Sequence, residues 1–372
     1  MFTVLVQNNK MKINYIAELN LPSNSAYSIH VMKICEAFSS KIKNTNLFVF
    51  NRNKKLNVFK KYNCSRKFKI NDFNLSNINF FTRIFFSLKI VKLVKKDDII
   101  ISRSIIAALI LSYFGFKVIL ELHHELYGFT KYLFTFSKNF IFFKKIKFIF
   151  ISKKLVKKFN LKNDTVILDD AVCLKDFYKI KNFKKKKNTC VYTGSFAKGK
   201  GLENIFKIST YNKNLKFDIY GDFSNSKYDR SSFDNFTNVK YCGHVDYNKI
   251  PLVLSKYKVA LMPYSKKVYV RSKNIEASKY MSPLKLFDYM ASKNIIIASK
   301  MQAYSHILNN QNSVILKNSS AKMWSKKINY VLKNYAKLSY LKNNAFKKVK
   351  RFTWEKRVEL IIDFANERLI RN

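Results

Sequence analysis

Short runs of β-branched and apolar residues alternate with stretches in which apolar residues recur every three to four positions. This alternation is typical of repeated βαβ units. The expected strands read as continuous apolar runs, as strands buried on both faces of a parallel sheet do. In the first half they are Ile13–Leu19, Leu47–Phe50, Ile99–Ser102, Val118–Leu122, Phe148–Ile151 and Val166–Leu168, with helices at Ser28–Ser40, Phe81–Val94 and Ile105–Tyr113.

The chain becomes polar and basic over residues 179–188 (KIKNFKKKKN), where we expect a linker. A second strand series follows it: Cys190–Thr193, Phe217–Tyr220, Val239–Tyr241, Val259–Pro263, Ile295–Ser299 and Val314–Leu316. We therefore expect two doubly wound, Rossmann-like α/β domains, residues 1–180 and 181–350. We expect a final helix in 351–372, which Thr353 can cap. This helix is a candidate for packing against the first domain. Ligands of open parallel sheets bind beyond the carboxyl ends of the strands, so the site is expected in a cleft between the domains.

The formal net charge is +48, a value that taken alone suggests a nucleic acid or an anionic membrane as partner. The excess of Lys and Arg is spread evenly over both halves, whereas a nucleic-acid binder would gather it on one face. Lys, Asn, Phe, Ile and Tyr share A/T-rich codons, so genome bias is the simpler explanation. We expect no nucleic-acid partner, although a basic surface still attracts anionic lipid head groups or sugar nucleotides.

The cysteines, the first residues of the chain and the longest apolar run indicate the cellular compartment. The five cysteines are scattered without a CxxC or His/Cys cluster, which fits a reducing cytoplasm and argues against structural zinc. Met1–Lys10 lacks a signal-peptide pattern, and Met11 would make a plausible start, so the first ten residues are a candidate extension. The longest uncharged apolar run, Ile105–Phe116, is too short to span a bilayer. We expect a cytoplasmic protein, soluble or peripheral on the inner face of the cell membrane.

Five of the seven glycines fall within one fifty-residue stretch, at Gly194, Gly199, Gly201, Gly221 and Gly243. In the first motif, 191–203, a strand ends at Gly194, a glycine–lysine loop follows, and a helix begins near Leu202. Glycines let backbone N–H groups approach an anion, and a helix N-terminus and lysine add positive charge. This pattern suits a diphosphate, although a purely structural strand–loop–helix turn remains an alternative.

The second motif, 280–291, reads YMSPLKLFDYMA and precedes the expected strand Ile295–Ser299. We expect Ser282 to be the N-cap of a helix and Pro283 its first residue. Lys285 then lies in the first turn, where a cation is unfavourable unless an anion is present. Asp288 lies three residues on, beside Lys285 on one face. The motif predicts a sugar-nucleotide clamp; the alternative is an ordinary capped helix with an internal ion pair.

These motifs resemble the nucleotide-binding half of glycosyltransferase family 4, the group 1 glycosyl transferases with the GT-B fold. The resemblance covers residues 189–332 through TG…KGLE (193–203), FDIYG (217–221), VKYCGHV (239–245), IPLVLSKYKVALMPY (250–264) and SPLKLFDYMASKNIIIAS (282–299). The first half resembles the family more weakly, through residues 15–38, ILELHHE (119–125) and VILDDAVCLKDF (166–177).

The resemblance implies a donor site. Lys200 matches the family lysine that contacts the donor diphosphate, and Asp288 stands at the second glutamate of the family's pair, which binds the ribose. His123 matches the family histidine near the donor sugar. The remaining donor-binding residues are Gly194 and Gly201 of the first motif, Gly243 and His244 of the base loop, and Ser282, Leu284 and Lys285 at the start of the helix.

The resemblance also implies a retaining, metal-independent transferase without a cofactor. It would move a sugar from a UDP- or GDP-linked donor to a glycan or lipid-linked acceptor in cell-surface polysaccharide synthesis. Tyr280 stands at the first glutamate of the pair and cannot act as a carboxylate. A non-catalytic sugar-nucleotide-binding or scaffold protein is therefore one alternative, and a nucleotide-sugar epimerase is another.

Two basic, apolar stretches, residues 80–96 and Phe129–Lys147, are candidates for membrane contact. Such sequences lie in membrane interfaces. They serve equally well as helices that cover a sheet with their lysines outward.

Overall fold

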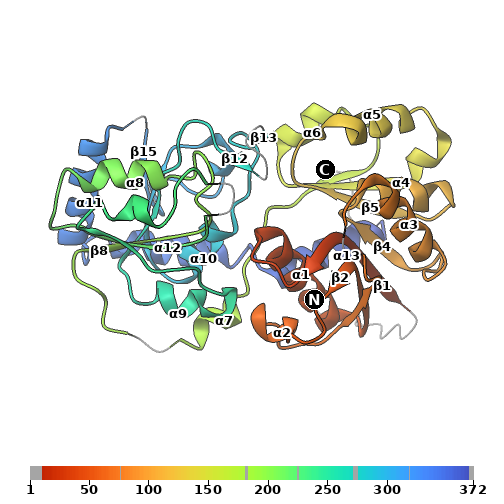
Figure 1. Cartoon of the computed structure of the whole chain (residues 1–372), viewed down its shortest axis with the longest axis horizontal. Helices are drawn as coiled ribbons and strands as arrows, with labels where there is room; N and C mark the ends of the chain where they lie inside the picture. The colour runs from red at the N-terminus through yellow and green to blue at the C-terminus, as the bar shows by residue number, and fades with distance from the viewer. Residues whose placement is uncertain are drawn as a thin grey trace. The chain divides into compact units, whose positions relative to one another are not determined.

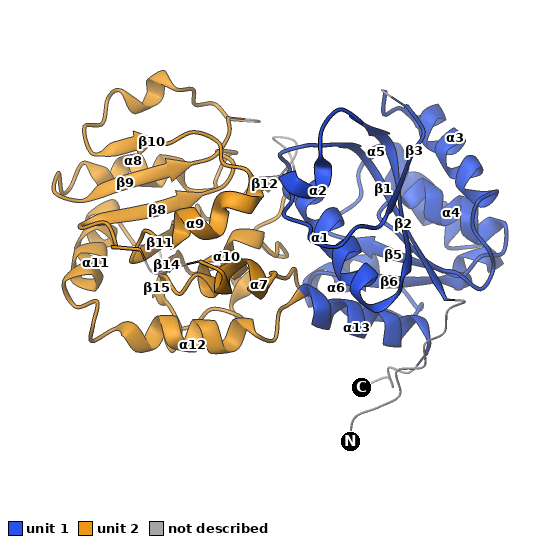
Figure 2. Cartoon of the chain, turned by 90° about the horizontal axis from the view of Figure 1, so that it is seen from below, with its two compact units in different colours: residues 1–168, 354–372 blue, residues 169–353 orange. Residues whose placement is uncertain are grey.

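The chain forms two compact units, residues 1–168 with 354–372 (unit 1) and residues 169–353 (unit 2), which Figure 2 colours separately. The computed structural model describes residues 11–75, 77–180, 183–223, 226–270, 275–317 and 319–367. The candidate extension Met1–Lys10 and residues 181–182 of the expected linker lie outside the described residues.

Unit 1 contains a seven-stranded sheet in the order β3-β2-β1-β4-β5-β6-β7, with every strand pair parallel. Figure 1 labels β1, β2, β4 and β5 of this sheet. The central order 3-2-1-4-5-6 is that of a Rossmann fold. The strands are β1 Lys12–Leu21, β2 Asn44–Arg52, β3 Lys69–Asp72, β4 Ile99–Ser102, β5 Val118–Leu122, β6 Ile146–Phe150 and β7 Thr165–Ile167. The helices are α1 Ala26–Lys41, α2 Val58–Lys61, α3 Phe80–Val91, α4 Ile105–Tyr113, α5 Gly128–Ser137, the 3-10 helix η1 Ile141–Lys145, α6 Lys153–Phe159 and α13 Trp354–Ala365.

Unit 2 contains a six-stranded parallel sheet in the order β10-β9-β8-β11-β14-β15 and a two-stranded antiparallel pair, β12 with β13. The strands are β8 Thr189–Thr193, β9 Lys216–Tyr220, β10 Val239–Tyr241, β11 Val259–Met262, β12 Tyr269–Val270, β13 Ile275–Glu276, β14 Ile295–Ser299 and β15 Val314–Leu316. The helices are α7 Leu174–Tyr178, α8 Leu202–Ser209, η2 Ser231–Phe233, η3 Tyr247–Lys249, α9 Ile250–Leu254, α10 Leu284–Ala291, η4 Gln302–Tyr304, α11 Ala321–Lys333 and α12 Ser339–Val349. Part of its core lies where α8 and α11 meet the sheet, around Phe206, Phe217, Trp324 and Ile328.

The two parallel sheets with flanking helices confirm the expected pair of Rossmann-like domains. Strand β3 was not expected, because its sequence KIND is polar and its side chains are exposed or half-buried at the sheet edge. Edge strands need no continuous apolar run, so the pattern that found the central strands misses this one.

The boundary between the units lies at Leu168/Asp169 and not at the expected 180/181. Residues 169–180 belong to unit 2, where the Asp170 N–H donates to Ser282 Oγ at 2.9 Å and α7 packs against α9. The basic segment also contacts unit 2, because the Lys186 N–H donates to the Lys256 carbonyl at 2.8 Å. Helix α13 belongs to unit 1, where it contacts α1 (Figure 2).

Candidate functional site

The turn after β8 in unit 2 brings backbone and lysine charge together. Gly194 and Gly201 both have positive φ, 131° and 108°, a region that side chains other than glycine rarely adopt. A Cβ atom on Gly194 would lie 2.6 Å from Lys285 Nζ, so any other residue here would displace the lysine ammonium. Gly201 is the N-cap of α8, and Lys200 directly before it donates to Ser195 Oγ at 2.9 Å.

Lys285 lies in the first turn of α10 as expected, and its ammonium is buried against the Gly194 turn. Among the described residues Nζ has no hydrogen-bond partner, so the alternative of an ion pair with Asp288 is wrong. Its nearest aromatic partner is Tyr192, whose ring centroid is 3.7 Å away. Burial and the neighbouring Lys200 lower the pKa of Lys285 well below its ordinary value. A bound anion would stabilise this cation, because a buried charge without a counter-charge is unfavourable.

Two tyrosines hold this turn in place. Tyr289 of α10 accepts a hydrogen bond from the Thr193 N–H at 2.8 Å, which fastens the helix to the end of β8. Tyr192 donates from its hydroxyl to the carbonyls of Ser195 and Lys200, at 3.0 and 3.1 Å, and so closes the loop between them. The lysines are therefore held before any ligand arrives, which is the condition for electrostatic stabilisation without reorganisation.

Asp288 lies one turn further along α10 and is buried. Tyr247, which follows the Gly243–Val245 loop, donates to Asp288 Oδ1 at 3.1 Å. Burial and the Asp288 carboxylate raise the pKa of Tyr247 well above its ordinary value. The base loop and α10 are thus linked through a tyrosine that the sequence analysis did not single out. His244 itself is exposed.

The start of α10 differs from the expectation at Ser282. The helix begins at Leu284, Pro283 is its N-cap with extended backbone, and no side chain caps it. Ser282 is instead bonded to the segment that enters unit 2, through the Asp170 N–H and, at 3.3 Å, Asp169 Oδ1. The serine is drawn out of the cap position by this tertiary contact. Leu284 is buried, and donor contact by Ser282 or Leu284 stays a prediction.

Tyr280, at the position of the missing glutamate, is buried at 2% exposure. Its hydroxyl donates to the Glu276 carbonyl at 2.6 Å. The Tyr280 ring therefore packs in the interior of unit 2. Its hydroxyl has a hydrogen-bond acceptor there, so tyrosine fits the position at which the family has a glutamate.

His123 directly follows β5 in unit 1 and joins a buried polar cluster. Its Nε2 donates to Glu121 Oε1 at 2.8 Å, and the Arg357 guanidinium of α13 donates to the same oxygen at 2.6 Å. The Tyr15 hydroxyl donates to Glu121 Oε2 at 2.7 Å, and His30 Nε2 lies 3.1 Å from Oε1. Burial raises the pKa of Glu121, but His30 and Arg357 outweigh it and hold that pKa well below its ordinary range.

The same cluster is the one place among the described residues where three potential metal ligands converge. Ligand atoms of His30, Glu121 and His123 lie within 4.8 Å of one another. The Arg357 guanidinium already occupies the shared carboxylate oxygen, and its charge would repel a divalent cation. The cluster therefore fits a charge-balanced ion pair better than a metal site.

The sequence predicted that His123 follows the end of a strand, but it did not predict the residues that orient the His123 ring. Arg357 is separated from Glu121 by 236 positions, so no local pattern connects them. His30 lies on α1 and stacks edge-on with both His123 and Trp354, at ring separations of 4.9 Å. A buried glutamate within the apolar strand VILEL was the one available signal.

Comparison with known proteins agrees with the fold described above. Residues 175–348 match the family described as Glycosyl transferases group 1. No curated protein is detectably similar in sequence. Solved structures share the fold at low identity, among them a glycosyltransferase from Rickettsia africae (14% identity, TM-score 0.70, covering 97% of this chain and 100% of that one).

Two further structures extend the comparison. Anabaena HepE in complex with UDP aligns at 12% identity and a TM-score of 0.72, over 96% of this chain and 100% of that one. Sucrose-phosphate synthase from Thermosynechococcus elongatus aligns at 14% identity and a TM-score of 0.69, over 96% and 99%. Every donor-binding residue expected from the sequence falls within 175–348. This segment is accordingly a group 1 glycosyl transferase domain, in a chain with the GT-B fold.

Proposed function

We propose that the protein is a retaining, metal-independent glycosyltransferase of cell-surface polysaccharide synthesis. It moves a sugar from a UDP- or GDP-linked donor to a hydroxyl of a glycan or lipid-linked acceptor. One observation carries the proposal: the buried Lys285 ammonium has no hydrogen-bond partner among the described residues and faces the Gly194 turn. Structures of HepE with UDP and with UDP and glucose support a nucleotide-sugar donor.

The reaction breaks the bond between the anomeric carbon and the diphosphate oxygen and forms one from that carbon to the acceptor oxygen. The acceptor proton leaves with the nucleoside diphosphate. Lys285 and Lys200 stabilise the negative charge that grows on the leaving oxygen, together with N–H groups at the starts of α8 and α10. Asp288 anchors the ribose, the Gly243–His244 loop holds the base, and His123 contacts the donor sugar.

The proposal is tested by calorimetry with UDP and GDP and by turnover with a panel of UDP- and GDP-sugars. We expect one nucleotide to bind and its sugar to be transferred or slowly hydrolysed. Nucleotide binding without donor turnover would favour the non-catalytic alternative that Tyr280 raises. Absence of any nucleotide binding would remove the proposed function altogether.

Replacing Lys200 by alanine is expected to weaken UDP or GDP binding by roughly ten- to hundred-fold. The reason is that a hydrogen bond to a charged group contributes about 1.5–3 kcal/mol. Lys198→Ala is the matched control, because Lys198 is in the same loop but exposed. Equal nucleotide affinities for the two variants would exclude Lys200 from the diphosphate site.

A surface of unit 1 supports peripheral membrane binding on the inner face of the cell membrane. More than half of the exposed large apolar side chains of the described residues lie within 78–141. The aromatic face, as we call it, comprises Phe81, Phe85 and Leu88 of α3 and Phe129, Tyr132 and Phe136 of α5, all at least 41% exposed. The rings of Phe80 and Phe129 lie 5.2 Å apart and join the two helices.

Neither helix of the aromatic face contains an acidic residue, whereas Arg83, Lys89 and Lys131 lie on them. Apolar side chains with surrounding cations match the interface of an anionic bilayer. No helix in the described part of the chain is long and apolar enough to cross a membrane. A peripheral contact is therefore the form of membrane binding that we propose.

Sedimentation with vesicles of phosphatidylglycerol and phosphatidylcholine tests this contact. We expect the protein to sediment with the anionic vesicles, and Phe81→Ser with Phe129→Ser to weaken binding about ten-fold or more, because each buried aromatic side chain contributes about 1.5–3 kcal/mol. Tyr211→Ser is the control, a ring 55% exposed in unit 2. Undiminished binding by the double variant would show that general basic charge alone attracts the protein.

A further inference from the structure

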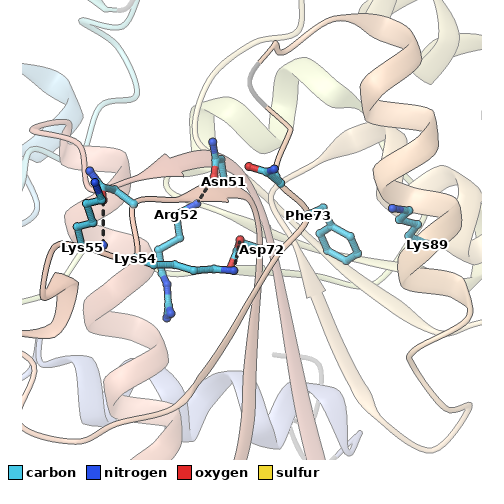
Figure 3. A pocket seen from close by; sticks show the side chains of 9 residues that line it. Asn51, Arg52, Lys54, Lys55, Asp72, Phe73 and Lys89 are labelled. Carbon is cyan, nitrogen blue, oxygen red and sulfur yellow. Dashed lines mark hydrogen bonds and ion pairs between the residues drawn. The ribbon is translucent and has the colours of Figure 1, made fainter.

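A basic pocket of about 740 Å³ lies in unit 1 where β2 and β3 end (Figure 3). Carboxyl ends of parallel strands are where ligands of such sheets bind. The pairing of Val49 with Asp72 places the two strand ends side by side, and the N–H groups of Phe73 and Leu75 donate to the Phe50 carbonyl. The residues lining this pocket, which we call the β2–β3 pocket, are Asn51–Lys55, Asp72–Asn74 and Lys89.

Four of the lining side chains are cationic, Arg52, Lys54, Lys55 and Lys89, against the single carboxylate of Asp72. Lys54 Nζ lies 3.8 Å from Asp72 Oδ2 and pairs with this carboxylate. Figure 3 shows the two side chains next to each other. Arg52 Nε is buried and has no hydrogen-bond partner among the described residues. Arg52, Lys55 and Lys89 form no ion pair within the part of the chain that the structure describes, so three positive charges of this concave surface have no counter-charge there.

The pocket also presents neutral donors and an apolar wall. The amides of Asn51, Asn53 and Asn74 border it, and Asn74 has positive φ of 55°, which turns the chain at the end of β3. Phe73 forms one wall, with Lys89 Nζ 5.9 Å from its ring centroid. Lysine, arginine and amide donors around a concave surface are the groups that bind phosphoryl oxygens.

Lys89 connects the pocket to the aromatic face. It lies on α3 and its ammonium is 4.3 Å from the ring centroid of Phe85, a member of that face. Helix α3 therefore carries both a side chain of the aromatic face and a lysine of the pocket. A phosphoryl group at a bilayer surface would contact Lys89 while the aromatic face contacts the lipid. The neutralising lysine Lys54 and the adjacent Lys55 extend the basic wall on the other side.

We infer that the β2–β3 pocket binds a phosphoryl or diphosphoryl group carried by the acceptor. This inference rests on the proposed function, because it assigns the acceptor of that transfer to the phosphorylated compounds. The pocket lies in unit 1, and the donor diphosphate residues Lys200 and Lys285 lie in unit 2, so the two anion sites share no residue. Transfer would occur at an acceptor hydroxyl, and the bound phosphoryl group would take no part in bond making.

Pyrophosphate titrations of the full-length protein separate the two sites. Wild type is expected to bind two pyrophosphates. Lys55→Gln with Lys89→Gln should lose the site in unit 1, with at least a ten-fold weaker affinity there, while UDP affinity is unchanged. Lys285→Met should lose the other site. Both lysines of the double variant are exposed, so folding is preserved, and an unchanged melting temperature verifies this.

The outcomes distinguish the inference from the proposed function. A double variant that binds pyrophosphate like wild type would overturn the inference, whatever its UDP affinity. Failure of wild type to bind UDP would overturn the proposed function, while loss of one pyrophosphate site in the double variant would still support an anion site in the pocket.

Two further arms identify the source of the phosphoryl group. If it is a lipid head group, Lys55→Gln with Lys89→Gln weakens binding to vesicles containing phosphatidic acid more than to phosphatidylglycerol vesicles of equal charge. If it is a soluble phosphate ester, glycerol 3-phosphate displaces pyrophosphate from the pocket and vesicle binding is unaffected. If neither lipid nor ester depends on the two lysines, the assignment to the acceptor is overturned.

Discussion

Lys285→Met is expected to stabilise the ligand-free protein and, at the same time, to weaken donor binding and turnover. The wild-type ammonium is buried and has no hydrogen-bond partner in the described ranges, a state that costs about 1–3 kcal/mol or more. Methionine fills similar volume without charge. We expect the melting temperature of the variant to rise by about 2–4 °C for each kcal/mol gained, and kcat/KM to fall by about 10²–10³-fold.

The difference in stability between Lys285→Met and the wild-type protein should depend on pH, because the pKa of Lys285 is lowered in the folded state. Between the folded-state pKa and the ordinary value near 10.4, the unfolded chain binds more protons than the folded one. Stability therefore rises with pH across this window. The advantage of Lys285→Met is largest below the folded-state pKa of Lys285 and disappears as pH approaches about 10.4.

Calorimetry in buffers of different ionisation enthalpy measures the corresponding proton uptake. A bound diphosphate favours the charged amine, so UDP binding should take up protons above the folded-state pKa of Lys285, and Lys285→Met should abolish this uptake. Lys213→Met, an exposed lysine of unit 2, is the control for stability and binding. A variant that melts lower than wild type and binds UDP normally would make Lys285 a structural residue.

Glu121→Gln is expected to cause the largest loss of stability. The substitution leaves the Arg357 guanidinium, 3% exposed, without its carboxylate in the interior of unit 1. Breaking a buried pair from one side costs about 3–5 kcal/mol, or about 6–20 °C in melting temperature for a unit of this size. The transferase activity should fall as well, because His123 loses the acceptor that orients Nε2.

A matched control exists on the helix that carries Arg357. Glu359 of α13 pairs with Lys41 at the end of α1 at 2.6 Å, but both side chains are exposed, at 51% and 38%. Glu359→Gln should therefore change stability by about 0–1 kcal/mol. Thermal unfolding of both variants at neutral pH measures the contrast. Equal melting temperatures would mean that the Glu121–Arg357 pair does not stabilise unit 1.

Acid should reduce the contrast between Glu121→Gln and wild type. The pKa of Glu121 is lowered in the folded state, so its carboxylate stabilises the fold fully above the unfolded value near 4.3. This stabilisation is lost as pH falls from there through the folded-state pKa. Melting temperatures between pH 7 and pH 3 should therefore converge at the acid end.

The parts of the fold that the sequence predicted are those with a local physical signature. Central strands such as Val118–Leu122 and Ile295–Ser299 are mostly apolar and β-branched, and both occur with the expected bounds. The predicted position of Lys285 in the first turn of α10 is confirmed, whereas its role in donor binding stays a prediction. Strand β3 had no such signature, since an edge strand tolerates the polar sequence KIND.

The interactions that the sequence did not predict are those between distant segments. Ser282 has every local property of an N-cap, yet a hydrogen bond from Asp170 draws it away. The Glu121–Arg357 pair joins positions 236 apart. The boundary at Leu168 was displaced because residues 169–180 pack against unit 2, although the composition changes only at Lys179. In each case a tertiary contact outweighs the local preference.

Because α13 belongs to unit 1, the ribosome completes this unit only after it has synthesised unit 2. The chain leaves unit 1 at Leu168 and re-enters at Trp354, and the Val172 N–H bonds the Phe352 carbonyl where these two passages meet. A ribosome therefore delivers the whole of unit 2 before Arg357 can reach Glu121. During that interval a nascent unit 1 carries a glutamate without its arginine, and this half-finished state is the one most exposed to chaperones and proteases.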